Sequence, residues 1–212
     1  MITVLTSSKG GSGTTITAAS CALQSALKNG SALLIDLCGD VPAALGMSEP
    51  STEGINEWLA ENQTANSEAL ILLGSTIDNG LIVIHRGSKF VEGQPRWAEL
   101  ATVLKRFPMP VFIDAGSAYL PDELRMIADR VWLVTRQCYL SLRRATQLPT
   151  PTGVIVVEEE GRALTGRDVA NVVGAPVVAN IPVTANIARS VDAGLLVSRA
   201  PQLIGSHLPE NL

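Results

Sequence analysis

The sequence lacks the features of a membrane-spanning protein, of a disulfide-stabilised protein and of a metal site built on cysteines. No uninterrupted apolar run approaches the roughly 20 residues that a membrane-spanning helix needs. No charged n-region precedes an apolar core at the N-terminus, so we expect a cytoplasmic protein. The three cysteines, Cys21, Cys38 and Cys138, are odd in number and have no metal-type spacing, which favours reduced thiols. The two histidines, His85 and His207, stand far apart, so structural or surface roles are expected.

Positive charge is also scarce. The chain carries 16 Lys and Arg against 20 Asp and Glu, a formal net charge of −4, whereas sequence-independent DNA binding needs a basic surface. Arg136, Arg143 and Arg144 form one local cluster that leaves room for a small basic patch; for Arg143 and Arg144 we prefer the alternative, a solvated helix face. The segment 203–212 contains no lysine or arginine. The sequence therefore predicts neither strong DNA binding nor a basic amphipathic membrane anchor.

What the sequence does contain is enough apolar residues for one core. Of its 212 residues, 46% are hydrophobic, which suits a single domain over residues 1–212. The expected strands are Ile2–Thr6, Ala32–Asp36, Leu81–His85, Val111–Asp114, Val131–Thr135, Val154–Val157 and Val177–Asn180. Helical patterns begin near Thr14 and cover Glu53–Glu61, Trp97–Arg106, Pro121–Ile127, Arg167–Val173 and Thr184–Ala193, with a polar link crossing the surface before residue 79. This alternation predicts an α/β fold: a mostly parallel sheet with helices on both faces.

One glycine-rich segment carries the strongest functional signal. Ser8-Lys9-Gly10-Gly11-Ser12-Gly13-Thr14-Thr15 follows the first strand and opens a helix with Ile16, Ala19, Leu23 and Leu27 on one face. Strand, glycine loop and helix in this order are typical of a phosphate-binding loop, in which backbone N–H groups and the helix dipole hold phosphate oxygens. A flexible turn is the alternative. The ordinary loop has a lysine directly after its last glycine, and here that position is Thr14.

The position of the remaining lysine points to a particular family. Lys9-Gly10-Gly11-Ser12-Gly13-Thr14-Thr15 resembles, at every position but Thr14, the deviant phosphate loop K-G-G-x-G-K-[ST] of the ParA/MinD ATPases. The resemblance implies a three-layer P-loop NTPase fold and a homodimer in which Lys9 reaches the partner's nucleotide. It also implies that residues 10–15 cradle the phosphates of ATP and that Thr15 ligates magnesium. A solvated surface lysine is the alternative for Lys9.

Further segments resemble the same family in its own order. Asp36-Leu37-Cys38-Gly39-Asp40 matches a D-x-D segment, so Asp36 becomes a magnesium-site residue, whereas the second acid falls on Cys38 and only Asp40 remains as a substitute. Asp114-Ala115-Gly116 resembles the Walker B and switch II sequence, where the aspartate holds magnesium. Capping of the next turn is the alternative for Asp114. Asn180-Ile181-Pro182-Val183 resembles the segment that places Pro182 against adenine.

Two devices for phosphoryl transfer thus look altered, at Thr14 and Cys38. Our leading hypothesis is a divergent ParA/MinD-like protein with weakened or absent ATP and Mg²⁺ use. Such a protein would act in positioning or assembly, in division, segregation or pilus placement, through dimerisation and a protein partner. The competing hypothesis is a genuine ATP-switched dimer that uses Lys9 in trans. A metabolic enzyme of related fold is the third hypothesis and the least favoured, since no substrate-specific insert is evident.

Overall fold

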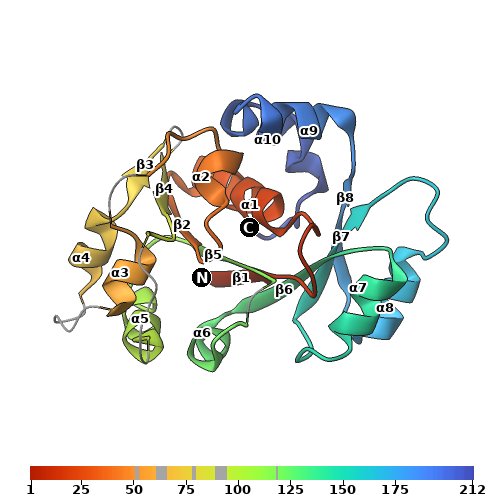
Figure 1. The fold of residues 1–212 in the computed structure, drawn as a ribbon, viewed down its shortest axis with the longest axis horizontal. Coiled ribbons are helices and arrows are strands. Elements are labelled where there is room, and N and C mark those ends of the chain that lie inside the picture. The colour runs from red at the N-terminus through yellow and green to blue at the C-terminus, as the bar shows by residue number, and fades with distance from the viewer. Residues whose placement is uncertain (51–52, 61–65, 78–79, 89–94, 118) are drawn as a thin grey trace.

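The structure is a computed structural model that describes residues 1–50, 53–60, 66–77, 80–88, 95–117 and 119–212. Its centre is a sheet in the order β3-β4-β2-β5-β1-β6-β7-β8 (Figure 1). The strands are β1 (Ile2–Thr6), β2 (Ala32–Asp36), β3 (Ser75–Thr76), β4 (Leu81–Ile84), β5 (Val111–Gly116), β6 (Arg130–Arg136), β7 (Gly153–Glu158) and β8 (Val177–Pro182). All pairings are parallel except that of β3 with β4.

Helices cover both faces of this sheet, which makes three layers (Figure 1). One face carries α1 (Thr14–Asn29), α2 (Val41–Ala44), α9 (Ala185–Asp192) and α10 (Leu196–Leu203), followed by the 3₁₀ turn η2 (Gly205–His207). The other face carries α3 (Ile55–Ala60), α4 (Ser67–Leu72), α5 (Trp97–Leu104), α6 (Asp122–Ile127), α7 (Tyr139–Ala145) and α8 (Gly166–Val173). The predicted α/β fold with a mostly parallel sheet and helices on both faces is confirmed.

The core follows from the two-residue period of the strands. In β2, Leu34 packs under α1 with Phe112 of β5, whereas Leu33 and Ile35 point the other way and pack with Ile113 beneath α3, α5 and α6. Both sets are fully buried. Because a parallel sheet is covered on both faces, its strands are apolar throughout rather than alternating with polar residues.

Most predicted elements are present, with shifted ends. Strand β8 continues past Asn180 to Pro182, and Pro121 and Thr184 precede α6 and α9 instead of beginning them. On α1, Leu27 was expected on the buried face but is 45% exposed, like Lys28 and Asn29 in the same last turn of the helix. The predicted helix at 53–61 is present as α3, with Ile55, Trp58 and Leu59 buried; Glu61 lies outside the described residues.

The region before residue 79 holds more structure than the sequence suggested. The helix α4 and the short antiparallel strand β3 follow Asn66, whose side chain caps α4 by accepting a hydrogen bond from the amide of Ala69 at 2.6 Å. Residues 61–65 of the expected polar link lie outside the described residues. Among the described helices, none is long and apolar enough to cross a membrane.

Candidate functional site

The glycine loop lies where the carboxyl ends of β1, β5 and β2 meet the N-terminus of α1. A cavity of about 550 Å³ opens at this edge of the sheet. It is lined by Ser7, Gly10, Gly11, Ser12, Gly13, Thr14, Thr15, Ile16, Cys38, Asp40, Ala43, Ala44, Gly116, Ser117 and Val191. Residues from four separate segments therefore meet here, at the edge where ligands bind in open parallel sheets.

Hydroxyl groups and glycines give the loop its shape. The Ser7 hydroxyl donates to the carbonyl oxygens of Lys9 and Gly116, each at 3.1 Å, which ties the end of β1 to the end of β5. The Ser12 hydroxyl donates to the Lys9 carbonyl at 2.9 Å and closes the turn. Gly11 and Gly13 have φ of 74° and 89°, backbone values that residues other than glycine rarely adopt. The loop is thus a defined structure rather than a flexible linker.

The start of α1 offers unpaired amide groups to this cavity. Thr17 N donates the first intrahelical bond, to Gly13 O at 3.0 Å, so the amides of Thr14, Thr15 and Ile16 precede the hydrogen-bonded part of the helix. Gly13 provides no side-chain cap, and no acidic residue stands in the first turn. An anion is the partner that such a helix start favours, because the free N–H groups and the helix dipole act together.

Asp114 is a buried carboxylate with one unused oxygen. It lies at the end of β5 with no exposed surface. Its Oδ1 accepts from Gly116 N at 3.0 Å, whereas Oδ2 has no hydrogen-bond partner. Burial raises the pKa of Asp114 to about 6, and the nearby Thr15 hydroxyl opposes this rise without making a hydrogen bond of ordinary geometry. An oxygen desolvated in this way costs free energy unless a cation or a donor satisfies it.

These groups fit the magnesium ion and phosphates that the resemblance implies. The unused Asp114 oxygen and the Thr15 hydroxyl are the hard oxygen donors that Mg²⁺ prefers. Capping of the following turn, the alternative for Asp114, is also present, since Oδ1 accepts the Gly116 amide. The two readings are compatible because they use different oxygens.

Asp36 shapes its own loop. Its carboxylate accepts three backbone amides, from Cys38 at 2.8 Å, Gly39 at 2.7 Å and Val41 at 3.0 Å. Burial raises the pKa of Asp36, and the amide bonds oppose that effect. Both oxygens are therefore engaged in holding the turn that leads into α2. A magnesium role for Asp36 stays a prediction.

The loop after Asp36 brings Cys38 and Asp40 to the cavity. The Cys38 thiol lies 3.8 Å from the Asp114 carbonyl oxygen. Burial, followed by the charges of Asp114 and Asp36, raises the pKa of Cys38 to about 12. A raised pKa favours the neutral thiol, whereas reactivity requires the thiolate, so Cys38 serves the site as a packing residue. Asp40 is exposed at the start of α2 and also lines the cavity.

No lysine or arginine stands among the described residues that line this cavity. Lys9 is half-buried, and its Nζ donates to the neighbouring Gly10 carbonyl at 3.2 Å, so it lies along its own loop. Arg86 lies behind the Asp36 loop and donates to the Cys38 carbonyl at 3.3 Å. The position that the motif gives to a lysine is filled by Thr14, which is 6% exposed.

A second hollow of about 230 Å³ adjoins the first. It contains Pro182 at the end of β8, followed by Val183 and Thr184, and it shares Gly13, Ile16 and Val191 with the cavity at the glycine loop. Pro182 thus lies beside that cavity, and its contact with adenine stays a prediction. Arg136 also lines this hollow and pairs with Glu159, which pairs in turn with Arg162.

Sequence reasoning missed several residues of the site. Ser7, Ala43 and Ala44 were not singled out as site residues, although all three line the cavity. Ser7 could have been found from its place between strand and glycine loop. Ala43 and Ala44 could not, because only the folded turn that Asp36 holds brings them there.

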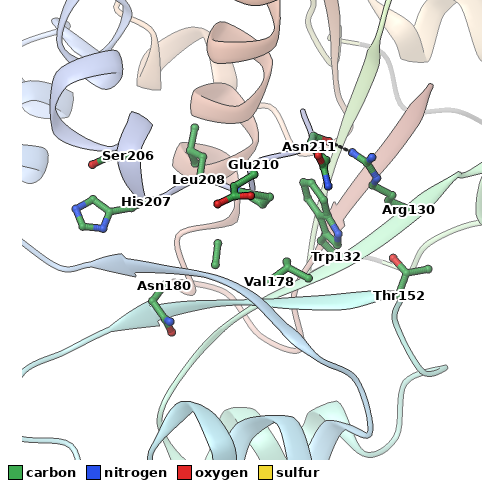
Figure 2. A pocket seen from close by; sticks show the side chains of 12 residues that line it. Arg130, Trp132, Thr152, Val178, Asn180, Ser206, His207, Leu208, Glu210 and Asn211 are labelled. Atoms are coloured by element: carbon green, nitrogen blue, oxygen red, sulfur yellow. Dashed lines mark hydrogen bonds between the residues drawn. The ribbon is translucent and has the colours of Figure 1, made fainter.

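A larger hollow, of about 730 Å³, contains none of the predicted site residues. Figure 2 shows it between Val178 and Asn180 of β8 and the C-terminal residues 206–211. Arg130 lies 5.6 Å from the centre of the Trp132 ring and donates to the Asn211 carbonyl. Among the described residues, no residue lining this hollow has a buried side-chain nitrogen or oxygen without a hydrogen-bond partner. We assign it no ligand.

Comparison with protein-family models and with curated protein sequences finds no match. Solved structures do match in fold. A ParA family ATPase from Chlorobium tepidum superposes with a TM-score of 0.77 at 20% identity, over 95% of this chain and 92% of the other. MinD in the Aquifex aeolicus MinC:MinD cell division complex gives 0.69 at 16%, over 100% and 98%. Pyrococcus horikoshii MinD complexed with Mg-ADP gives 0.69 at 18%, over 95% and 89%. The chain therefore has the ParA/MinD-like P-loop fold.

Proposed function

We propose that this protein is a nucleotide-binding, hydrolysis-impaired member of the ParA/MinD group that acts in intracellular positioning or assembly through a dimer and a protein partner. The observation that carries the proposal is one combination: a glycine loop beside a buried Asp114 with one unpartnered oxygen, and a cavity in which Thr14 stands where the motif has a lysine. The processes named for proteins of this fold, cell division among them, supply the positioning role.

The binding half of the proposal is supported by the groups that stay unsatisfied. The amides at the start of α1 would hold phosphate oxygens, while Thr15 and Asp114 would hold Mg²⁺. When bound, the ion neutralises charge on the β- and γ-phosphates. Pro182, Val183 and Val191 provide apolar surface for a base in the adjoining hollow.

The impaired half is supported by what the cavity does not supply. Phosphoryl transfer depends almost wholly on positioning and on charge stabilisation, and removal of one stabilising contact typically costs about 10²–10³ in rate. Thr14 brings no charge to the phosphates, and the neutral Cys38 thiol replaces a carboxylate. Asp40 is exposed at the cavity and is the remaining acid that could orient water.

The proposed dimer rests on Lys9 and its surroundings. Lys9 lies at the same edge of the sheet as Tyr139 and Leu140, which are 71% and 60% exposed at the start of α7. The Ser8 hydroxyl donates to the Ser141 carbonyl at 2.8 Å, so the loop and α7 form one surface. Exposed apolar side chains at the same edge as Lys9, whose only hydrogen-bond partner in the described part of the chain is the Gly10 carbonyl, suit a contact with a second copy.

An ATP-switched dimer in which the partner's Lys9 supplies the missing charge is the second candidate. The same Lys9 geometry favours it, and rapid hydrolysis would distinguish it from the first. A metabolic enzyme of related fold has less support, because the described residues contain no cluster of three or more metal-binding side chains.

Two measurements on the purified chain test the proposal. Titration calorimetry with Mg-ATP is expected to show binding that Asp114→Ala removes, and steady-state phosphate release is expected to be slow or undetectable. Phosphate release at the rate of ordinary ATPases, abolished by Asp114→Ala, contradicts the proposed impairment of hydrolysis. Absence of any nucleotide binding contradicts the proposed nucleotide binding.

A further inference from the structure

The hollow that contains Pro182 lies between the sheet and one helix. Its lining comes from the ends of three strands and from α9: Arg136 of β6, Val157 of β7, Ile181 of β8, and Ile187, Val191 and Asp192 of α9. Gly13 belongs both to this hollow and to the cavity at the glycine loop. A nucleotide whose phosphates lie on the amides at the start of α1 would therefore place its base here, and we call this the base hollow.

Two charged side chains line the base hollow among the described residues, and their signs are opposite. Arg136 lies at the end of β6, in the sheet, and Asp192 lies at the end of α9, in the helix layer above it. Because the two charges oppose each other, the hollow selects no ligand by net charge. What it offers a base is hydrogen-bond donors on the sheet side and acceptors on the helix side.

The Arg136 guanidinium keeps one edge free. Its Nη1 donates to Glu159 Oε1, and this ion pair holds the group at the end of β6. Its Nε is buried and has no hydrogen-bond partner, and Nη2 donates to no group in the described part of the chain. The Nε–H and one Nη2–H of a planar guanidinium point the same way, so they form a parallel pair of donors. A buried donor of this kind is normally satisfied by an acceptor.

Asp192 presents acceptors only. It is exposed at the last residue of α9, and its carboxylate accepts no hydrogen bond and forms no ion pair within the residues that the structure describes. An ionised carboxylate has no proton to donate. The side chain therefore suits an edge of a ligand that carries N–H groups.

Guanine matches both of these groups, whereas adenine matches them poorly. Guanine carries the acceptors O6 and N7 side by side, which the parallel donors of an arginine bind together, and it carries N–H donors at N1 and N2. Adenine has an amino donor at position 6 and an acceptor at N1. In the base hollow, adenine would turn its amino group toward the Arg136 donors and its N1 lone pair toward the Asp192 carboxylate.

We propose that the base hollow binds guanine in preference to adenine, with Arg136 donating to O6 and N7 and Asp192 accepting from N1 and N2. The proposal names the base for the nucleotide site of the proposed function and rests on that site. An adenine nucleotide would still bind through its phosphates and Mg²⁺, but less tightly. Arg136 and Asp192 thus determine specificity and take no part in phosphoryl transfer.

Titration calorimetry with three Mg-nucleoside diphosphates on the full-length chain tests the choice of base directly. GDP, ADP and IDP share their ribose and phosphates and differ only in the base; IDP keeps O6, N7 and the N1 proton but lacks the amino group at N2. A good bidentate contact discriminates between bases by about tenfold or more. We therefore expect the Kd of ADP to exceed that of GDP by at least about tenfold, with the Kd of IDP between them.

Four variants assign the preference to its residues. Arg136→Met keeps the apolar stem and removes the donors, so it should lower the ADP-to-GDP ratio of Kd by at least about fivefold. Asp192→Ala should weaken GDP binding more than ADP binding. Glu159→Gln weakens the same ion pair but keeps the Arg136 donors, so the ratio should stay high. Arg199→Met, on the exposed surface of α10 outside the hollow, is the matched control and should leave every Kd unchanged; thermal melts confirm that each variant folds.

Equal binding of GDP and ADP, tighter binding of ADP, or a ratio that survives Arg136→Met overturns the base proposal while nucleotide binding itself stands. An equal loss of preference in Glu159→Gln also overturns it, because the ion pair rather than the free donor edge would then set the specificity. If none of the three nucleotides binds, the nucleotide site of the proposed function fails, and the base proposal fails with it.

Discussion

Restoring the lysine at position 14 tests the central idea about the phosphate cavity. Thr14 lines the cavity, so in Thr14→Lys the longer side chain would extend into space already present there rather than into the core. A charge-assisted contact to phosphate is worth about 1.5–3 kcal/mol. We therefore expect the Kd for Mg-ATP to fall by about 10- to 150-fold.

Titration calorimetry on wild type and Thr14→Lys at one salt concentration measures the change. Thr102→Lys, on the exposed side of α5, adds the same charge away from the cavity and controls for long-range attraction. An unchanged Kd in Thr14→Lys would refute the reasoning, because a loop shaped for phosphate cannot ignore a cation at this position. Equal gains in both variants would show that only net charge matters.

Three further predictions concern the acids, the dimer and a close backbone approach. Burial raises the pKa of Asp114 from 3.8 to about 6, so this carboxyl ionises at lower pH in the unfolded chain than in the folded one. In metal-free protein the free energy of unfolding should therefore fall as pH rises from about 4 to 6, by up to roughly 3 kcal/mol. Urea melts at a series of pH values should show a weaker dependence of the unfolding free energy on pH in Asp114→Asn. Sedimentation with and without ATP should show a dimer that Lys9→Ala weakens; a monomer under all conditions would remove the dimer from both candidate functions. Gly46→Ala should cost several kcal/mol in urea melts, since a Cβ there would lie 2.3 Å from the Gly194 carbonyl oxygen, whereas Gly161→Ala, with φ of 79° but open space, should cost about 1–2 kcal/mol.

Local patterns carried much of the prediction. The strands of the sheet are runs of apolar and β-branched residues, so β1, β2 and β5 could be read directly from Ile2–Thr6, Ala32–Asp36 and Val111–Asp114. The glycine loop is equally local, because its shape needs glycine at Gly11 and Gly13 whatever surrounds it. Helix α10 was missed, since Pro201 within it is a signal against a helix.

The site shows where such patterns stop. The residues Asp36, Asp114 and Thr15 were named from motifs, but their roles depend on neighbours far away in the chain. Three amides of the following loop engage Asp36, whereas Asp114 keeps one free oxygen. Asp36 and Asp114 both follow an apolar strand in the sequence, and only the folded loops show which of the two keeps a free oxygen.

By itself, then, the sequence determined the layered α/β architecture, the glycine loop and the presence of Thr14 where the motif has a lysine, because each depends on residues adjacent along the chain. Only the tertiary structure decided that the lining of the cavity includes no arginine or lysine among the described residues. It alone decided that Lys9 rests on the Gly10 carbonyl, and that Asp114 keeps one oxygen without a hydrogen-bond partner. The physical reason is that burial, pKa and pairing are set by groups brought together across the sheet, at separations that no local pattern encodes.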